Sequence, residues 1–276
     1  MKRMSQETNI STTDEDTLSI FIPKIVMQTW KTTTVPDIWK DGQKSVIDLN
    51  TARGWKYVLM TDTDNRNFIC DHFPEYLECY DQFEYNIQRV DFIRYAWLYV
   101  HGGVYIDLDY EMYIPFDEII QYMKDKHGCD HEAYIPRTSE SANAFMISVP
   151  KCRFWIHLMN SIVNEKPHWY QSFEKHLYIL YTTGPKRLLN CVVQYGYGNR
   201  IGDIPKELFP TCSICSRDSV KMSAKKLEGC SWITPTAKLF TKVWCNSEMI
   251  LFIILLIVLI FYVWIYFGWD RFFMKV

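Results

Sequence analysis

The sequence predicts an α/β domain with a mainly parallel central sheet flanked by helices, followed by a C-terminal transmembrane helix. Three observations support this prediction. Short apolar strand patterns alternate with helical patterns along most of the 276 residues, which is typical of parallel strands joined by helices. Residues 89–112 combine a helical pattern, a glycine pair, an aromatic strand and two aspartates. Residues 249–269 carry no formal charge.

Composition sets the expected domain boundaries and the class of partner. Residues 1–19 are polar, lack an apolar signal core and are expected to be a disordered tail. Residues 20–242 are long enough for one domain with a substantial core. The net charge of −2 and the lack of a basic patch argue against nucleic acid as a partner. The aromatic content of 16% suits stacking on sugars and bases.

The first strand is expected within residues 22–30, which are rich in Ile and Val and end in Gln28, Thr29 and Trp30. Trp30 would offer an aromatic face on which a nucleotide base can stack, with Gln28 close by. A tryptophan after a strand can also belong to the core, so these residues alone leave both interpretations open.

A helix is predicted over residues 87–100, because apolar and aromatic side chains recur there at three- and four-residue spacing. Gly102 and Gly103 are expected to end it. Asp91 and Arg94 lie three residues apart and therefore on one helix face. Two interpretations are open for them. They form an ion pair within the helix, or they contact a ligand, with the guanidinium donating two hydrogen bonds to a phosphate or a sugar hydroxyl.

Residues 104–106 have the composition of a buried strand, and Asp107 and Asp109 follow where that strand should end. Residues two apart in a strand point the same way, so both carboxylates, and Tyr105 before them, are expected to face one site. Such oxygens suit a hard divalent cation, Mn²⁺ or Mg²⁺, that keeps positions open for phosphate. An isolated D-X-D is often only a polar strand end, but this context indicates a metal and diphosphate site.

Taken together, these motifs resemble the DXD-containing family of sugar transferases that includes yeast initiating α-mannosyltransferases and inositolphosphoceramide mannosyltransferases. The resemblance extends along most of the chain before Lys242. It implies a GT-A-like fold that binds a nucleotide sugar, with Trp30 as the base platform. It also implies that Asp91, Arg94 and Tyr105 lie near the donor sugar.

Two later segments carry the same resemblance. Asn143 precedes an apolar strand expected over residues 144–149, and the resemblance implies that this asparagine lies near the donor sugar. The sequence G-C-S-W at residues 229–232 is similar to an element that closes over the diphosphate in this family. There Ser231 would bond a phosphate or the metal, and the indole of Trp232 would steady the leaving group.

The chain also departs from the family pattern at two places. Many relatives carry a histidine before the glutamine that corresponds to Gln28, whereas this chain has Met27. Many carry another histidine before the late glycine, whereas residues 223–228 here read SAKKLE. Lys225 or Lys226 is the expected substitute at that second position.

The predicted activity is metal-dependent transfer of a hexose, with retention, from a nucleotide-diphosphate sugar to a hydroxyl of a glycan or glycolipid acceptor at a membrane. The metal, held mainly by Asp109 with Asp107 assisting, would neutralise the diphosphate. GDP-mannose is the first expectation for the donor, and a UDP-sugar is the alternative. A catalytically impaired nucleotide-sugar-binding protein and a metal-dependent hydrolase are the competing hypotheses.

The uncharged segment 249–269 is dominated by Ile, Leu, Val and aromatics and is long enough to cross a bilayer as a helix. A membrane protein with a single C-terminal span is therefore expected. Lys238 and Lys242 before the segment balance Arg271 and Lys275 after it, so the positive-inside rule does not orient it. An endomembrane or Golgi location and a cytosol-facing membrane location both stay open.

Overall fold

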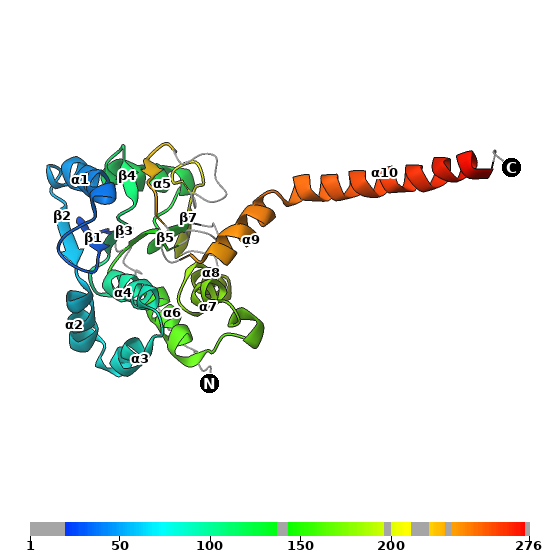
Figure 1. Ribbon diagram of the computed structural model, residues 1–276. Coiled ribbons are helices and arrows are strands. Elements are labelled where there is room, and N and C mark those ends of the chain that lie inside the picture. Colours follow the sequence, from blue (N-terminus) through cyan, green and yellow to red (C-terminus); the bar gives the residue numbers. More distant parts are fainter. Residues whose placement is uncertain (1–19, 137–142, 196–199, 211–220, 230–232, 274–276) are drawn as a thin grey trace, which may run out of the picture.

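The residues described by the computed structural model are 20–136, 143–195, 200–210, 221–229 and 233–273, the last range with only part of its side chains. The tail expected at residues 1–19 lies outside them. The described chain is a mixed α/β fold in which helices cover both faces of a six-stranded sheet. A long C-terminal helix, α10, extends away from this body (Figure 1).

The main sheet has the strand order β2-β1-β3-β6-β5-β7. Strand β1 runs parallel to β2 and β3, and β5 runs parallel to β7, whereas β6 is antiparallel to both β3 and β5. The expected mainly parallel sheet is therefore a mixed one, because β6 runs against the strands on either side of it. The bounds are β1 Ile25–Thr29, β2 Lys56–Met60, β3 Gly103–Ile106, β5 Ala133–Pro136, β6 Phe145–Ser148 and β7 Ile201–Ile204.

A second, two-stranded sheet joins distant parts of the sequence. Strands β4 (Tyr110–Met112) and β8 (Ala224–Lys226) pair antiparallel, with Lys226 opposite Tyr110. Because β4 directly follows the two aspartates, this pairing brings a segment more than 100 residues later in the chain beside them.

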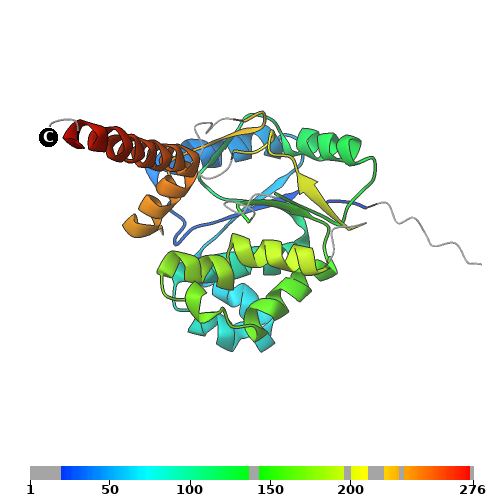
Figure 2. The ribbon, with the colours of Figure 1, turned by 90° about the vertical axis from the view of Figure 1, so that its right-hand side faces the viewer.

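Helices form a layer on each face of the main sheet (Figure 2). Side chains alternate along β3, so that Val104 and Ile106 join the core under α1 and α5, whereas Tyr105 joins the core under α4 and α6. The bounds are α1 Asp37–Thr51, α2 Asp62–His72, α3 Leu77–Gln82, α4 Asn86–His101, α5 Phe116–His127, α6 Arg153–Asn164, α7 Lys175–Thr182, α8 Pro185–Tyr195, α9 Pro235–Cys245 and α10 Ser247–Phe273. Two 3₁₀ turns cover Pro74–Tyr76 and Trp169–Gln171.

Helix α4 confirms the helix predicted over residues 87–100 and ends at Gly102, whose φ is +65°. Gly103 has a φ of +77°, and a Cβ there would overlap the carbonyl group of Ile25 on β1. Only glycine therefore fits where β3 begins beside β1. Helix α4 is buried on most sides, because the sheet and helices α2, α3, α6 and α7 surround it.

The transmembrane helix expected over residues 249–269 falls within α10. Searched over the part of the chain that the structure describes, no helix is both long and apolar enough to cross a membrane. The predictions of a C-terminal transmembrane helix and of a single-pass membrane location are therefore wrong.

Candidate functional site

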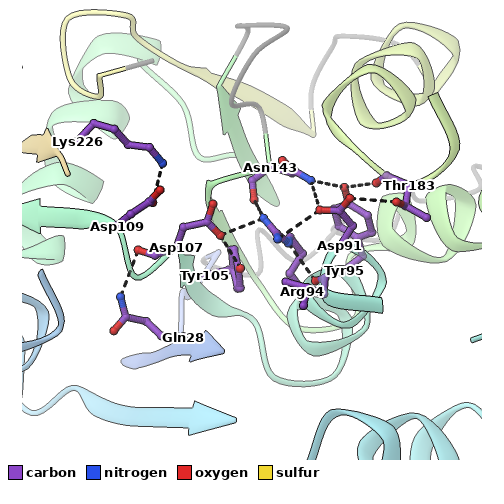
Figure 3. A network of polar contacts seen from close by, with 11 residues as sticks. Gln28, Asp91, Arg94, Tyr95, Tyr105, Asp107, Asp109, Asn143, Thr183 and Lys226 are labelled. Carbon is purple, nitrogen blue, oxygen red and sulfur yellow. Dashed lines mark hydrogen bonds and ion pairs between the residues drawn. The ribbon is translucent and has the colours of Figure 1, made fainter. Parts of the chain in front are cut away.

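The two aspartates lie in the turn between β3 and β4. The backbone N–H of Asp107 donates to the carbonyl of Ala144 at 2.9 Å, which fixes the start of the turn beside β6. Leu108 and Asp109 form a turn rather than a continued strand, so strand alternation does not reach Asp109. Asp107 consequently points toward α4, while Asp109 points toward β8 (Figure 3).

Arg94 on α4 lies at the centre of a buried polar network (Figure 3). Its side chain is 3% exposed, and its guanidinium donates to Asp107 Oδ1 at 3.1 Å and to the carbonyl of Asn143 at 2.6 Å. The same group pairs with Asp91 Oδ1 at 3.2 Å and lies 4.5 Å from the centre of the Tyr105 ring. The ion pair within the helix therefore forms, and the same guanidinium also holds one aspartate of the D-X-D.

Asp91 is enclosed by partners from three parts of the chain. Its carboxylate accepts hydrogen bonds from Asn143 Nδ2 at 2.8 Å and from Thr183 Oγ1 at 3.0 Å, besides the pair with Arg94. Tyr95 closes the network, because its hydroxyl accepts from Asn143 Nδ2 and donates to the carbonyl of Thr183. Burial raises the pKa of Asp91 to about 6, against the opposing effect of Arg94. No sequence pattern indicated that Tyr95 would take part.

Tyr105 and Gln28 both donate hydrogen bonds to Asp107. The Tyr105 hydroxyl donates to Asp107 Oδ1 at 2.6 Å, and Gln28 Nε2 donates to the Asp107 carbonyl at 3.3 Å. Both side chains are buried. Gln28 in turn accepts from the hydroxyl of Tyr57, whose pKa is raised by burial to about 12. Tyr105 and Gln28 therefore support the turn, and Tyr57 is a further supporting residue that the sequence did not indicate.

Trp30 follows β1 and is partly exposed beside the aspartate turn. It contacts Trp39 edge-on, with ring centres 4.8 Å apart, and packs in a small apolar cluster with Leu108 and Leu227. The Trp39 indole N–H donates to the carbonyl of Glu228 at 2.7 Å. Trp39 therefore links residues 227–229 to the apolar cluster beside the aspartate turn. No sequence pattern indicated this contact.

Asp109 pairs with Lys226, one of the two lysines named as the expected substitute for the missing histidine. Lys226 Nζ donates to Asp109 Oδ1 at 2.6 Å, and the two side chains are 5% and 12% exposed. Burial raises the pKa of Asp109, and Lys226 opposes that rise. Although burial alone would lower the pKa of Lys226, Asp109 and Tyr110 raise it, so the ammonium stays protonated at neutral pH. Lys225 instead points to the surface, 3.8 Å from Glu111.

The late glycine of G-C-S-W lies directly against the site. A Cβ on Gly229 would overlap Asp109 Oδ2, so any other residue at this position would require the Asp109 carboxylate to move. Ser231 and Trp232 lie outside the described residues. The approach of Gly229 to Asp109 nevertheless places the beginning of this element beside the D-X-D.

The donor set fits a divalent cation that is shared with a substrate. Within the described residues, no group of three or more His, Cys, Asp and Glu side chains could hold a metal by itself. Asp107 Oδ1 is engaged by Arg94 and Tyr105, whereas its Oδ2 forms no hydrogen bond to the described residues. Mg²⁺ and Mn²⁺ are commonly held by one or two carboxylates together with water and substrate phosphates. Asp107 and Asp109 are the residues that would supply the protein's share of such a site.

In sequence, this chain is similar to known glycosyltransferases. Residues 36–124 match the family model described as "Glycosyltransferase sugar-binding region containing DXD motif". Inositol phosphoceramide mannosyltransferase 2 of Schizosaccharomyces pombe is 39% identical over 167 residues, which cover 59% of this chain and 44% of the relative. Mannosyl phosphorylinositol ceramide synthase SUR1 of Saccharomyces cerevisiae is 34% identical over 176 residues, covering 63% and 42%.

Two further matches cover larger shares of the matched protein. Inositol phosphoceramide mannosyltransferase 1 of S. pombe is 25% identical over 235 residues, covering 84% of this chain and 68% of that protein. Among solved structures, the PaToxG glycosyltransferase aligns with a TM-score of 0.41 and 17% identity, covering 63% of this chain and 70% of that one. This chain spans less than half the length of the relatives that are 34–39% identical to it. The matched region, residues 36–124, includes Arg94 and the D-X-D turn, so this part of the chain is similar to glycosyltransferase sugar-binding regions that contain a DXD motif.

Proposed function

We propose that this protein transfers a hexose from a nucleotide-diphosphate sugar to a hydroxyl of a glycan or glycolipid, with a divalent metal and with retention of anomeric configuration. The observation that supports this most is the D-X-D turn inside the matched family region. There a buried guanidinium, a tyrosine hydroxyl and a glutamine amide orient Asp107.

The exposure of each side chain suggests the role that we propose for it. Asp107 and Asp109, on one turn, would hold Mn²⁺ or Mg²⁺ together with the diphosphate. When bound, the metal neutralises charge that develops on the departing diphosphate. Trp30 is partly exposed and beside Leu108, which suits a stacking surface for the base. Asp91, at 4% exposure, acts as a positioning residue through Arg94 and Asn143.

The burial of Asp91 favours a mechanism in which the acceptor hydroxyl attacks the sugar from the side of the leaving group. A covalent route would need a carboxylate free to reach the sugar. Asp91 already accepts from Asn143 and Thr183 and is paired with Arg94, so it has neither the exposure nor the freedom for that step. The proposed mechanism therefore has the acceptor hydroxyl attack on the face that the diphosphate leaves, with the departing diphosphate taking its proton.

Mannose is the proposed sugar and GDP-mannose the proposed donor. Support comes from the names of the matched yeast proteins, which are called inositol phosphoceramide mannosyltransferases and a mannosyl phosphorylinositol ceramide synthase. An acceptor of the phosphoinositol-ceramide class is proposed on the same ground.

The test is an assay of transfer and of donor hydrolysis, measured together by mass spectrometry, with GDP-mannose, UDP-glucose, UDP-galactose and UDP-GlcNAc. The full chain is assayed with Mn²⁺ and with EDTA, on phosphoinositol-ceramide and on simple sugar acceptors. We expect metal-dependent transfer from one donor, and proton NMR of the product should show a retained anomeric configuration. Hydrolysis without transfer to any acceptor would favour the hydrolase hypothesis, and no turnover of any donor would refute an enzymatic function.

Two variants make the test specific for the site. Asp109→Asn removes one charged ligand and should lower metal-dependent transfer at least 100-fold. Glu111→Gln is the matched control, because this nearby acid lies on β4, is partly exposed and pairs only loosely with Lys225 at 3.8 Å. It should leave turnover within about twofold. Equal losses in the two variants, with unchanged circular dichroism, would contradict the assignment of Asp109.

A further inference from the structure

Each aspartate of the D-X-D is paired with a positive side chain supplied by the protein. Arg94 from α4 holds Asp107 at 3.1 Å, and Lys226 from β8 holds Asp109 at 2.6 Å (Figure 3). Arg94 directs four of its five N–H groups to Val90, Asp91, Asp107 and Asn143, and its guanidinium lies 4.5 Å from the centre of the Tyr105 ring. Lys226 has fewer protein partners.

The Lys226 ammonium has more hydrogen-bond donors than partners in the described part of the chain. A lysine ammonium carries three N–H groups. Asp109 Oδ1 accepts one of them, and Tyr110 lies below the ammonium, with Nζ 4.1 Å from its ring centre. At least one N–H of a side chain that is 95% buried is therefore left for another acceptor. A buried, unsatisfied cationic donor beside a diphosphate site is suited to a phosphate oxygen.

The β-ladder explains why this lysine, and not its neighbour, reaches the site. Lys226 lies opposite Tyr110, the residue directly after Asp109, and Lys225 lies opposite Glu111. Successive residues of a strand point to opposite faces, so one lysine turns inward to Asp109 and the other outward to the surface. The ladder therefore fixes the inward ammonium next to the carboxylate before any ligand arrives.

We propose that Lys226 is a phosphate-binding residue of this site, which is held by Asp109 and donates to the diphosphate of a bound nucleotide as a cation built into the protein. This inference rests on the proposed function, since it takes a nucleotide diphosphate as the ligand. It goes beyond that function by giving nucleotide binding a component that needs no metal.

Lys226 and Asp109 then have opposite effects that binding experiments can separate. Asp109 repels phosphate and attracts the metal, whereas Lys226 attracts phosphate and repels the metal. Removing the lysine should weaken nucleotide binding in EDTA and spare the enhancement by Mn²⁺. Removing the aspartate charge should do the reverse, because it frees the ammonium and deletes a metal ligand.

The experiment is isothermal titration of the full chain with GDP and with UDP, each in EDTA and in Mn²⁺. A charge-assisted hydrogen bond to a buried phosphate corresponds to roughly a 10-fold or larger change in affinity. We expect Lys226→Met to weaken the binding of the preferred nucleotide in EDTA by that factor. Lys225→Met, the matched control on the same strand, should change it by less than about twofold.

Further variants separate binding from folding. Lys226→Met leaves Asp109 buried without its partner, so the double variant Lys226→Met with Asp109→Asn removes both charges and should fold like the parent by circular dichroism. It should bind nucleotide in EDTA as weakly as the single lysine variant. Lys226→Arg keeps the charge and should restore most of the EDTA affinity. Asp109→Asn alone should keep or strengthen EDTA binding while losing the Mn²⁺ enhancement.

The possible failures are distinguishable. If Mn²⁺ supports nucleotide binding but Lys226→Met and the parent have the same affinity in EDTA, the inference about Lys226 is overturned and the proposed function survives. Parallel losses in the lysine and aspartate variants under both conditions would indicate a structural ion pair and would also overturn it. If neither nucleotide binds under any condition, the proposed function fails and the inference fails with it.

Discussion

Replacing Arg94 by methionine removes the cation at the centre of the buried network. The guanidinium pairs with Asp91 at 3.2 Å and with Asp107 at 3.1 Å, and the side chains of Arg94 and Asp91 are only 3% and 5% exposed. Methionine has a similar length and fills much of the space beside Tyr105, so the substitution changes charge more than volume. Asp91 is then left buried with only Asn143 and Thr183 as partners.

The expected cost follows from that burial. Removing one partner of a buried ion pair costs about 3–5 kcal/mol, because the remaining charge is neither solvated nor compensated. For a domain of this size, each 1 kcal/mol lowers Tm by roughly 2–4 °C, so Arg94→Met should lower it by roughly 6–20 °C. The cost should shrink at low pH. Asp91 already has a pKa of about 6, and loss of Arg94 raises that pKa further, so protonation relieves the unpaired charge.

The assay is urea unfolding of the full chain, followed by circular dichroism at pH 5.5 and pH 7.5. Arg66→Met is the matched control. Arg66 forms a two-pronged pair with Asp81, at 2.8 Å and 2.6 Å, but the two side chains are 52% and 40% exposed. An exposed pair contributes about 0–1 kcal/mol. A loss in Arg94→Met no larger than in Arg66→Met, or one that does not shrink at pH 5.5, would refute the reasoning.

Two other predictions test the network and the sheet. Burial raises the pKa of Asp91 to about 6 from an ordinary value of 3.8, so its favourable contribution is complete below pH 4 and is lost as pH rises through 6. Between pH 4 and pH 7 the parent should therefore lose roughly 3 kcal/mol of unfolding free energy relative to Asp91→Asn, and parallel urea-unfolding curves across that range would contradict it. Gly103→Ala should destabilise the fold by several times the cost of Gly54→Ala, since both glycines have positive φ but only a Cβ at Gly103 would overlap the Ile25 carbonyl. Similar Tm values for these two alanine variants would show that β1 and β3 tolerate the clash.

Local sequence pattern was sufficient for the elements around the site. Helical spacing over residues 87–100 and the glycine pair after it predicted α4 and its end, and the β-branched run before Asp107 predicted β3. The apolar run over residues 144–149 likewise corresponds to β6. Each of these depends on contacts between near neighbours in the chain, which is why periodicity and turn residues reveal them.

Those local patterns did not indicate which strands pair, or whether paired strands run parallel or antiparallel. The antiparallel placement of β6 between β3 and β5 made the sheet mixed, and nothing in the composition of a buried strand distinguishes the two directions. The apolar run in α10 was interpreted as a membrane span from composition alone, and the described structure contradicted that interpretation.

The sequence by itself indicated the residues that are proposed to carry the chemistry: the two aspartates after β3, and Asp91 and Arg94 on one face of α4. Only the tertiary structure decided which partners surround each of them. Asp91 is enclosed by Thr183, 92 residues away in the sequence, and Asp109 is paired with Lys226, 117 residues away. These contacts depend on how helices and ladders pack across the sheet, and the free energy of such long-range packing leaves no periodic signal in the sequence.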